Sequence, residues 1–260
     1  MDFGVTGKVT IVTGGSSGIG LATARVFHQE GATVVINGRD EDRLNAAVTA
    51  IGPNAHGVVA DLTTPDGAKK LHDFATGFGP VEILINNIGR FDVEDFQAIS
   101  DERWHEYFDT NLMTGVRITR PVFSEMLQRN SGSVIFIASE AAVRSIPFMV
   151  HYSVTKTAQL GLARALAEMT RGTNVRVNAY LPGPTATDSV KAYFQGIAKD
   201  RGIGFDDVVR GFFEKDQPGS LIQRLIDPEQ HGRAILQLAT NWAMNGTAQR
   251  ADGGAIHSIL

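Results

Sequence analysis

Short apolar runs alternate with longer stretches of helical periodicity along most of this chain. The runs are rich in β-branched and aliphatic residues, and we predict them as strands at about residues 9–13, 33–37, 57–60, 81–85, 133–138, 174–180 and, more weakly, 247–251. Apolar residues recur at helical spacing between them, in 21–30, 101–129, 150–171 and 228–239. This alternation predicts a doubly wound parallel sheet of about seven strands in one three-layer α/β/α domain spanning residues 1–260.

A glycine-rich turn, residues 14–20, separates the first predicted strand from the first helix. A strand, a glycine turn and a helix in this order are typical of phosphate binding, because the backbone approaches the pyrophosphate and the helix amino end presents free N–H groups. The spacing of Gly14, Gly18 and Gly20 departs from the usual G-x-G-x-x-G. The pattern predicts a Rossmann-like dinucleotide site; a tight turn that only packs helix on strand is the alternative.

The end of the second predicted strand bears on the choice of dinucleotide. An acidic residue there accepts from a ribose 2′-hydroxyl, whereas an arginine accommodates a 2′-phosphate. The chain has Asn37 and Gly38 followed by Arg39. We therefore predict NADP(H) in preference to NAD(H), with a solvated Arg39 at a helix start as the alternative.

Other strand ends carry polar residues that meet at the same edge of a parallel sheet. Asp61 follows the third strand and is a candidate acceptor for the adenine amino group. Asn86 and Asn87 follow the fourth, where tying neighbouring strands together is at least as good an explanation as ligand contact. The proline and glycine turn 182–187 follows the sixth strand and would wall one side of the cofactor pocket.

The candidate chemistry lies between residues 139 and 156. Tyr152 and Lys156 stand four apart on one face of the predicted helix 150–171, and a neighbouring cation favours the phenolate. Taken alone, such a pair is usually an aromatic and a lysine on a partly solvated surface. Ser139, however, ends the fifth strand and would face the same crevice. Asn111, inside the helix 101–129 that Ser100 would cap, is unfavourable there and indicates a local reason for its presence.

Composition narrows the functional class. The net charge of −4 gives no signal for nucleic acid or an anionic membrane, and the chain has no cysteine. The seven histidines are scattered, so we predict no metal site. The first residues lack the apolar core of a signal peptide and no apolar run is long enough to span a membrane, so we expect a soluble, cytoplasmic protein. Residues 188–226 mix phenylalanines with charges and glycines, which suits a mobile substrate lid; packing on the body is the alternative.

These elements resemble the classical short-chain dehydrogenase/reductase (SDR) family over essentially the whole chain. The matching motifs are Thr13-Gly14-x-x-x-Gly18-x-Gly20, Asn86-Asn87-x-Gly89, Asn111, Ser139, Tyr152-x-x-x-Lys156 and Pro182-Gly183.

The resemblance implies a role for each matching residue. Tyr152 would exchange the proton of a carbonyl or alcohol oxygen that Ser139 holds. Lys156 would bind the nicotinamide ribose and lower the pKa of Tyr152. Asn111 would hold a water that links Lys156 to solvent, and Thr187 would contact the carboxamide. The cofactor contacts predicted in full are Gly14, Ser16, Ser17, Gly18, Ile19, Gly20, Arg39, Asp61, Leu62, Asn87, Gly89, Tyr152, Lys156, Pro182, Gly183, Thr185 and Thr187.

The resemblance also implies a small-molecule carbonyl or alcohol substrate and a homo-oligomer, either a tetramer or a dimer. Two departures stand out: Ile88 replaces the alanine usual in this motif and would crowd the cofactor, and Ser17 replaces a basic residue. We predict an NAD(P)-dependent oxidoreductase acting on CH–OH groups. A 3-oxoacyl-thioester reductase that binds an acidic carrier through Arg129 and Arg171 is one alternative, and a non-catalytic NADP(H)-binding sensor or scaffold is another.

Overall fold

One parallel sheet organises the computed structural model, which describes residues 3–258. Its strand order is β3-β2-β1-β4-β5-β6-β7, and every pairing is parallel. The strands are β1 Val9–Val12, β2 Thr33–Gly38, β3 Ala55–Val59, β4 Val81–Asn86, β5 Gly132–Ile137, β6 Val175–Pro182 and β7 Ala248–Ala251. The predicted doubly wound sheet is confirmed, with strand ends shifted by one or two residues. The ends of the predicted domain, residues 1–2 and 259–260, lie outside the described residues.

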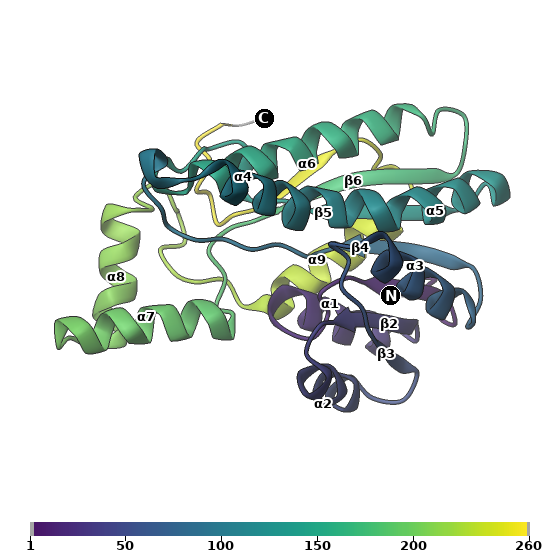
Figure 1. The fold of residues 1–260 in the computed structure, drawn as a ribbon, viewed down its shortest axis with the longest axis horizontal. Coiled ribbons are helices and arrows are strands. Elements are labelled where there is room, and N and C mark those ends of the chain that lie inside the picture. The colour runs from purple at the N-terminus through teal and green to yellow at the C-terminus, as the bar shows by residue number, and fades with distance from the viewer. Residues whose placement is uncertain (1–2, 259–260) are drawn as a thin grey trace.

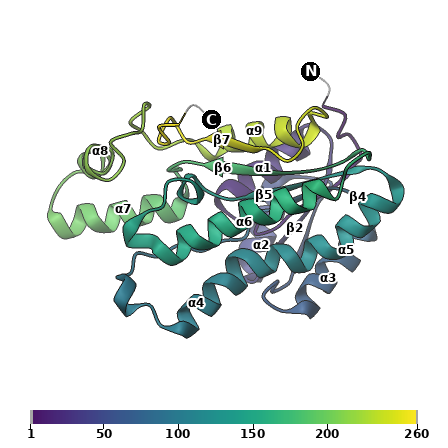
Figure 2. The ribbon, with the colours of Figure 1, turned by 90° about the horizontal axis from the view of Figure 1, so that it is seen from above.

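Helices cover both faces of the sheet (Figure 1, Figure 2). They are α1 Gly18–Gln29, α2 Glu41–Ile51, α3 Pro65–Thr76, α4 Asp101–Phe108, α5 Thr114–Arg129, α6 Val150–Glu168, α7 Asp188–Arg201, α8 Phe205–Lys215 and α9 Pro228–Thr240. Short turns of helix are η1 Phe96–Ala98, η2 Asp109–Met113, η3 Glu140–Ala142 and η4 Pro147–Met149.

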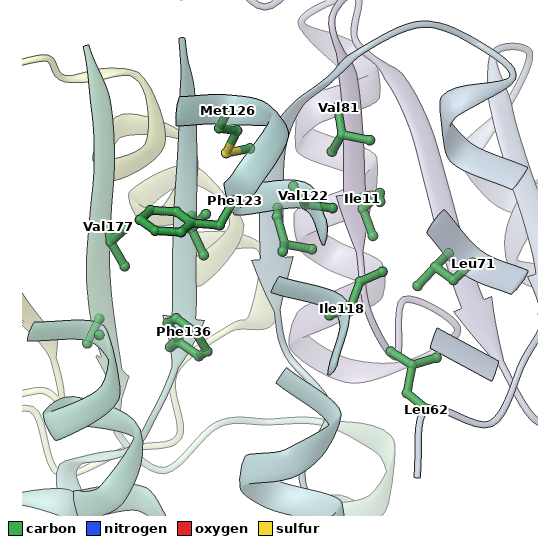
Figure 3. Close-up of a cluster of buried hydrophobic side chains, with 14 of the residues drawn as sticks. Ile11, Leu62, Leu71, Val81, Ile118, Val122, Phe123, Met126, Phe136 and Val177 are labelled. Atoms are coloured by element: carbon green, nitrogen blue, oxygen red, sulfur yellow. The ribbon is translucent and has the colours of Figure 1, made fainter. Parts of the chain in front are cut away.

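Each face of the sheet has its own hydrophobic core. On one face, residues of α3, α5 and α6 pack against β1, β4, β5 and β6; Figure 3 shows Leu71, Ile118, Phe123 and Met126 of this cluster. On the other face, α1, α2 and α9 supply residues such as Phe27, Leu44 and Ile235. Strands covered on both sides are mostly apolar, and all four residues of β1 are buried, three of them apolar and one the threonine Thr10. The three-layer arrangement is therefore a direct consequence of the continuous apolar runs in the sequence.

The segment from Ser100 to Arg129 has the predicted cap at its start and an irregular turn in its middle. The Ser100 side chain accepts a hydrogen bond from the Arg103 amide at 3.2 Å, which confirms it as the cap of α4. The predicted helix 101–129 is helical throughout, but in its middle the chain widens into a π-helical turn, η2, around Asn111. Such turns interrupt the regular hydrogen bonds of a helix and are frequent at functional sites.

Helices α7 and α8 project from the body of the molecule (Figure 1). Phe194, Ala198 and Val208 form a separate small cluster, against which Phe205 and Phe212 pack. The phenylalanines of residues 188–226 thus pack mainly on one another. This small cluster is separate from the two cores that flank the sheet.

Within residues 3–258, the model contains no helix that is both long and apolar enough to cross a membrane.

Candidate active site

The carboxyl ends of the strands bring the predicted site residues to one edge of the sheet. The glycine turn follows β1, Asn87 and Gly89 follow β4, Ser139 follows β5, and residues 183–187 follow β6. These turns lie where the strand order reverses, between β1 and β4, or next to that point. In open α/β sheets this crevice is where ligands bind.

The glycine turn has the geometry of a dinucleotide cradle. Gly14 and Gly18 adopt positive φ angles of 61° and 54°, which favour glycine. A Cβ on Gly20 would lie 2.4 Å from Asn87 Nδ2, so glycine is required for this close approach. Ser17 caps α1 without a side-chain hydrogen bond. The first amides of α1 therefore have no side-chain acceptor there, as a helix end that receives a pyrophosphate requires.

Around this turn, Asn87 is a tie between strands, as one of the two interpretations predicted. Its Nδ2 donates to Thr13 O at 2.9 Å, and its amide donates to Thr13 Oγ1 at 2.9 Å. Ile19 packs against the core on the α1 side, and Ile88 Cγ1 lies 3.2 Å from the position of a Cβ on Gly14. Ile88 therefore lines the turn, as the crowding prediction requires.

The end of β2 brings Arg39 close to the glycine turn. Arg39 is exposed, and a Cβ on the preceding Gly38 would lie 3.2 Å from Ser16 Oγ. A hydroxyl and a guanidinium thus flank this strand end. Asn37 is fully engaged in the fold: its Oδ1 accepts from the Gly14 amide and its Nδ2 donates to Ala60 O, both at 3.0 Å.

The end of β3 has a polar and an apolar residue side by side. Asp61 Oδ1 accepts from the amide and hydroxyl of Thr63. Burial opposes ionisation of Asp61, but these hydrogen bonds and the charges of Arg39 and Arg117 hold its pKa below the usual range. Leu62, in contrast, is a core residue (Figure 3), so its side chain packs inside the protein. Its backbone alone is left for the predicted cofactor contact.

Ser139 and Tyr152 come together where β5 ends and α6 begins. Ser139 Oγ accepts from the Ala141 amide at 3.1 Å, which caps η3 and fixes the hydroxyl. A hydrogen bond from Ser139 favours the phenolate of Tyr152. Ser139 Oγ also lies 3.0 Å from Glu140 Oε2, a buried carboxyl that the sequence analysis did not single out.

Lys156 is buried and held by two acceptors. Its Nζ donates to Ile137 O at 2.8 Å and to Gln159 Oε1 at 3.1 Å. Gln159 Nε2 in turn donates to the main-chain oxygen of Asn111. The structure therefore places a side chain, Gln159, between Lys156 and Asn111, where the resemblance implied a water. Gln159 lies three residues after Lys156 on one helix face, and that spacing is the signal that was missed.

The pKa values of the tyrosine and lysine differ from expectation. Burial raises the pKa of Tyr152, and the charge of Glu140 raises it further, while the hydrogen bond from Ser139 opposes both. Burial lowers the pKa of Lys156 to about 7. Lys156 does not contribute to the shift of the Tyr152 pKa in this arrangement of the site, and the lowering that the resemblance implies stays a prediction. The lysine Nζ lies 5.7 Å from the centre of the tyrosine ring and directs its protons to other acceptors.

Gly89 and Asn111 lie around the catalytic candidates, and Gly18 lies against the loop after β6. A Cβ on Gly89 would lie 3.2 Å from Lys156 Nζ. The side chain of Asn111 accepts from the Arg90 amide at 2.8 Å and donates to Thr155 Oγ1 at 3.0 Å. On the far side, a Cβ on Gly18 would lie 3.1 Å from Thr187 Cγ2, so the loop after β6 meets the glycine turn. The predicted cofactor residues at both ends of the crevice are thus brought together.

The loop after β6 is held by His231 of α9, which the sequence analysis missed. His231 Nε2 lies 2.9 Å from Thr185 Oγ1, and Nδ1 lies 2.7 Å from the Tyr180 hydroxyl. Thr185 Oγ1 donates to Gly183 O, so the tautomer that satisfies all three groups carries its proton on Nε2. The Thr185 hydroxyl is consequently used inside the protein. The Gly183 amide pairs with Ala251 O, which joins Pro182 and Gly183 to β7.

The sheet, the glycine turn and the residues gathered at its edge define a class of protein, a Rossmann-like domain built to bind a dinucleotide. The family model described as short chain dehydrogenase matches residues 8–198, and this chain belongs to the short-chain dehydrogenase/reductase family of oxidoreductases.

Similar proteins cover its whole length. The oxidoreductase YvrD of Bacillus subtilis is 43% identical, with 100% of both chains covered. L-sorbose reductase from Gluconobacter frateurii, solved in complex with NADPH and L-sorbose, is 31% identical with a TM-score of 0.94 and 100% of both chains covered. The 3-oxoacyl-[acyl-carrier-protein] reductase FabG of Chlamydia muridarum is 28% identical over 95% of this chain and 96% of its own.

Proposed function

We propose that this protein reduces the carbonyl group of a small molecule to a secondary alcohol with NADPH, and catalyses the reverse oxidation. The observation that carries the proposal is the meeting of Ser139 and Tyr152 at the carboxyl end of β5, with Lys156 buried on the same face of α6. A hydroxyl and a phenol on one side of a ligand crevice can both bond to the same substrate oxygen.

In this proposal each residue has one task. Hydride comes from the dinucleotide when it is bound. Ser139 Oγ holds the substrate oxygen, and Tyr152 gives that oxygen its phenolic proton as negative charge develops on it. Lys156 places a positive charge beneath the phenol when it is protonated.

The preference for NADPH rests on the end of β2. The Ser16 hydroxyl and the exposed Arg39 offer a hydrogen bond and a fork of donors that suit a phosphate monoester. The NADPH bound to the L-sorbose reductase, which is similar over its whole length, supports the same choice.

The two carrier-binding residues of the acyl-thioester alternative have different surroundings. The Arg129 guanidinium donates to Glu82 Oε1 at 3.2 Å and to Val81 O, so it is engaged in the fold. Arg171 remains exposed and 3.8 Å from Glu168. One exposed arginine beside a glutamate is a small surface for an acidic carrier protein, so we favour a free small-molecule carbonyl.

The test measures oxidation of NADPH and NADH by the purified protein with 3-oxoacyl thioesters, cyclic ketones, ketosteroids, quinones and ketoses. We expect turnover with one class and a preference for NADPH. Arg39→Ala should raise the KM for NADPH about 10-fold and leave that for NADH within about 2-fold, since it removes a bidentate charge pair. Arg233→Ala, an exposed arginine on α9, is the matched control. Faster turnover with NADH would overturn the cofactor assignment, and tight NADPH binding without turnover would favour the sensor.

A further inference from the structure

We propose that Glu140 is a positioning residue for the reaction, and that its protonation state decides whether the Ser139 hydroxyl donates its proton to Glu140 or is free to donate it to the substrate oxygen. This inference rests on the proposed carbonyl reduction, in which Ser139 must donate to the oxygen that is being reduced.

The argument begins with the single proton of Ser139. A serine hydroxyl has one proton and two lone pairs. One lone pair accepts from the Ala141 amide at 3.1 Å. The serine proton is directed to Glu140 Oε2, at 3.0 Å, and the Tyr152 hydroxyl, whose pKa responds to Ser139, is the other neighbour that this proton can reach. Only one of these two neighbours can receive the serine proton at a time.

Glu140 sets the direction of this chain of hydrogen bonds. An ionised carboxylate can only accept, so it must take the proton of Ser139, and Tyr152 is then left to donate to Ser139. A neutral carboxylic acid carries its own proton and can donate to Ser139 Oγ. The serine proton is then free to point at the reacting oxygen. The same side chain therefore blocks Ser139 as a donor in one form and frees it in the other.

The surroundings of Glu140 make both forms accessible near neutral pH. Glu140 is 6% exposed, and within residues 3–258 no salt bridge pairs it with a lysine or arginine. Burial raises its pKa to about 7, against the opposing hydrogen bond from Ser139. An isolated glutamate titrates well below this value.

The charged neighbours come from three elements. Asp252, after β7, raises the pKa of Glu140, whereas Arg144, at the end of its own short helix, lowers it. The Arg144 guanidinium is directed to Gln217 and to Asp216 O. From α6, Tyr152 and Lys156 face the same region, with the lysine bonded to Ile137 O. On β6, the Tyr180 hydroxyl is taken by His231.

The charge of Glu140 acts in the same sense as the hydrogen bonds. An ionised Glu140 raises the pKa of Tyr152 and so makes the phenol a poorer acid. A neutral Glu140 removes that repulsion and frees Ser139. Both effects favour carbonyl reduction below the ionisation of Glu140 and oppose it above.

The experiment compares pH profiles of kcat/KM for carbonyl reduction in the wild type and in Glu140→Gln. A glutamine side chain can donate its amide N–H to Ser139 at every pH, as the neutral acid does. We expect the wild type to lose about 10-fold or more between pH 6 and pH 8.5 in a step near pH 7, and Glu140→Gln to lack that step. If the step persists in the variant, the ionisation belongs to Lys156, whose pKa also lies near 7, and the proposal is overturned.

Two further measurements keep the test decisive. Asp252→Asn removes a negative neighbour, so the step should move to lower pH; an unmoved step contradicts the proposal even if Glu140→Gln does not fold. Infrared difference spectra of the protein between pH 6 and pH 9 should show a buried carboxylic acid band that Glu140→Gln loses. That band requires no turnover, so its presence with no active substrate separates a failed function from a failed role of Glu140.

Discussion

Two mostly buried polar clusters in this protein differ in how completely their hydrogen-bonding groups are paired and in how their groups titrate. The first, which we call the reactive cluster, contains the buried residues Asn111, Ser139, Glu140, Lys156 and Gln159 together with the half-buried Tyr152; the second, the His231 cluster, contains Tyr180, Thr185 and His231. In the His231 cluster one tautomer satisfies all three groups, and burial lowers the pKa of the imidazole to about 4. In the reactive cluster an acid and an amine each have a pKa of about 7.

The difference shows what burial alone does not reveal. A buried neutral network with every donor paired stabilises one geometry, here that of the loop after β6. A buried group that has no partner of opposite charge is costly, and it gains or loses a proton with small changes in its surroundings. Perturbed titration together with unpaired charge therefore supports the proposal that the reactive cluster is where the proton is transferred.

The largest expected effect is on turnover, from removal of the Tyr152 hydroxyl. Tyr152→Phe keeps the ring and deletes the proton donor, so kcat should fall by about 10²-fold or more while the Kd for NADPH changes by about 3-fold at most. Stopped-flow and equilibrium fluorescence titration would measure the two quantities. Tyr193→Phe, at an exposed tyrosine on α7, is the control. Equal turnover in the wild type and Tyr152→Phe would contradict the proposal that the reactive cluster, unlike the His231 cluster, takes part in the reaction.

Removal of the histidine should affect stability. His231→Phe leaves the Tyr180 hydroxyl and Thr185 without their ring partner, so we expect a loss of about 2–3 kcal/mol in the free energy of unfolding. Chemical denaturation at pH 7 measures it, with substitution of the exposed His105 as the control. A variant as stable as the wild type would mean that the closed hydrogen bonds contribute little.

The lowered pKa of His231 leads to a prediction of how the free energy of unfolding changes at acidic pH. Its folded pKa, about 4, lies below the value near 6.5 expected in the unfolded chain, so the unfolded state binds the proton first. The stability present above pH 6.5 should be lost as the pH falls from 6.5 through 4, by up to about 3 kcal/mol. His231→Phe should show a flatter curve over this range. If the pH dependence of stability in His231→Phe had the same slope as in the wild type, another group would be responsible for the loss of stability.

The smallest expected effect comes from Gln159, which links Lys156 to the main chain of Asn111 in the reactive cluster. Gln159→Leu takes one acceptor from Lys156 and one donor from Asn111 O, and Gln159→Glu adds a negative charge beside the ammonium. The lysine pKa should fall in the first variant and rise in the second, so the limb of the kcat/KM profile that Lys156 controls should move in opposite directions. Gln128→Leu, on the exposed part of α5, is a suitable control. Shifts of the same sign in both variants would assign Gln159 a packing role only.

The parts of the structure that the sequence predicted are those with short-range causes. The strands are continuous apolar runs, the Ser100 cap is a local hydrogen bond, and the glycine turn is required by positive φ angles and close approach. The order of Ser139, Tyr152 and Lys156 along the chain was enough to predict their meeting, because parallel strands bring their carboxyl ends to one edge.

The remaining features depend on contacts between distant segments. Glu140 stands in an apolar stretch beside Ser139, yet its ionisation depends on burial and on Asp252, more than a hundred residues further along the chain. His231 looked like one of seven scattered histidines, and only the packing of α9 places it against Tyr180. The phenylalanines of α7 and α8 could pack on the sheet or on each other, and periodicity does not distinguish the two.

Helix α9 packs against α1 so closely that a Cβ on Gly232 would lie 3.0 Å from Ala22 O. Helix α1 is thus covered by α9, which is synthesised much later. Until residues 228–240 have been synthesised, Phe27, Ile36 and their neighbours lack part of their apolar cover. Folding of this face must therefore wait until α9 has been synthesised, and until then the exposed apolar residues of α1 and β2 favour aggregation or chaperone binding.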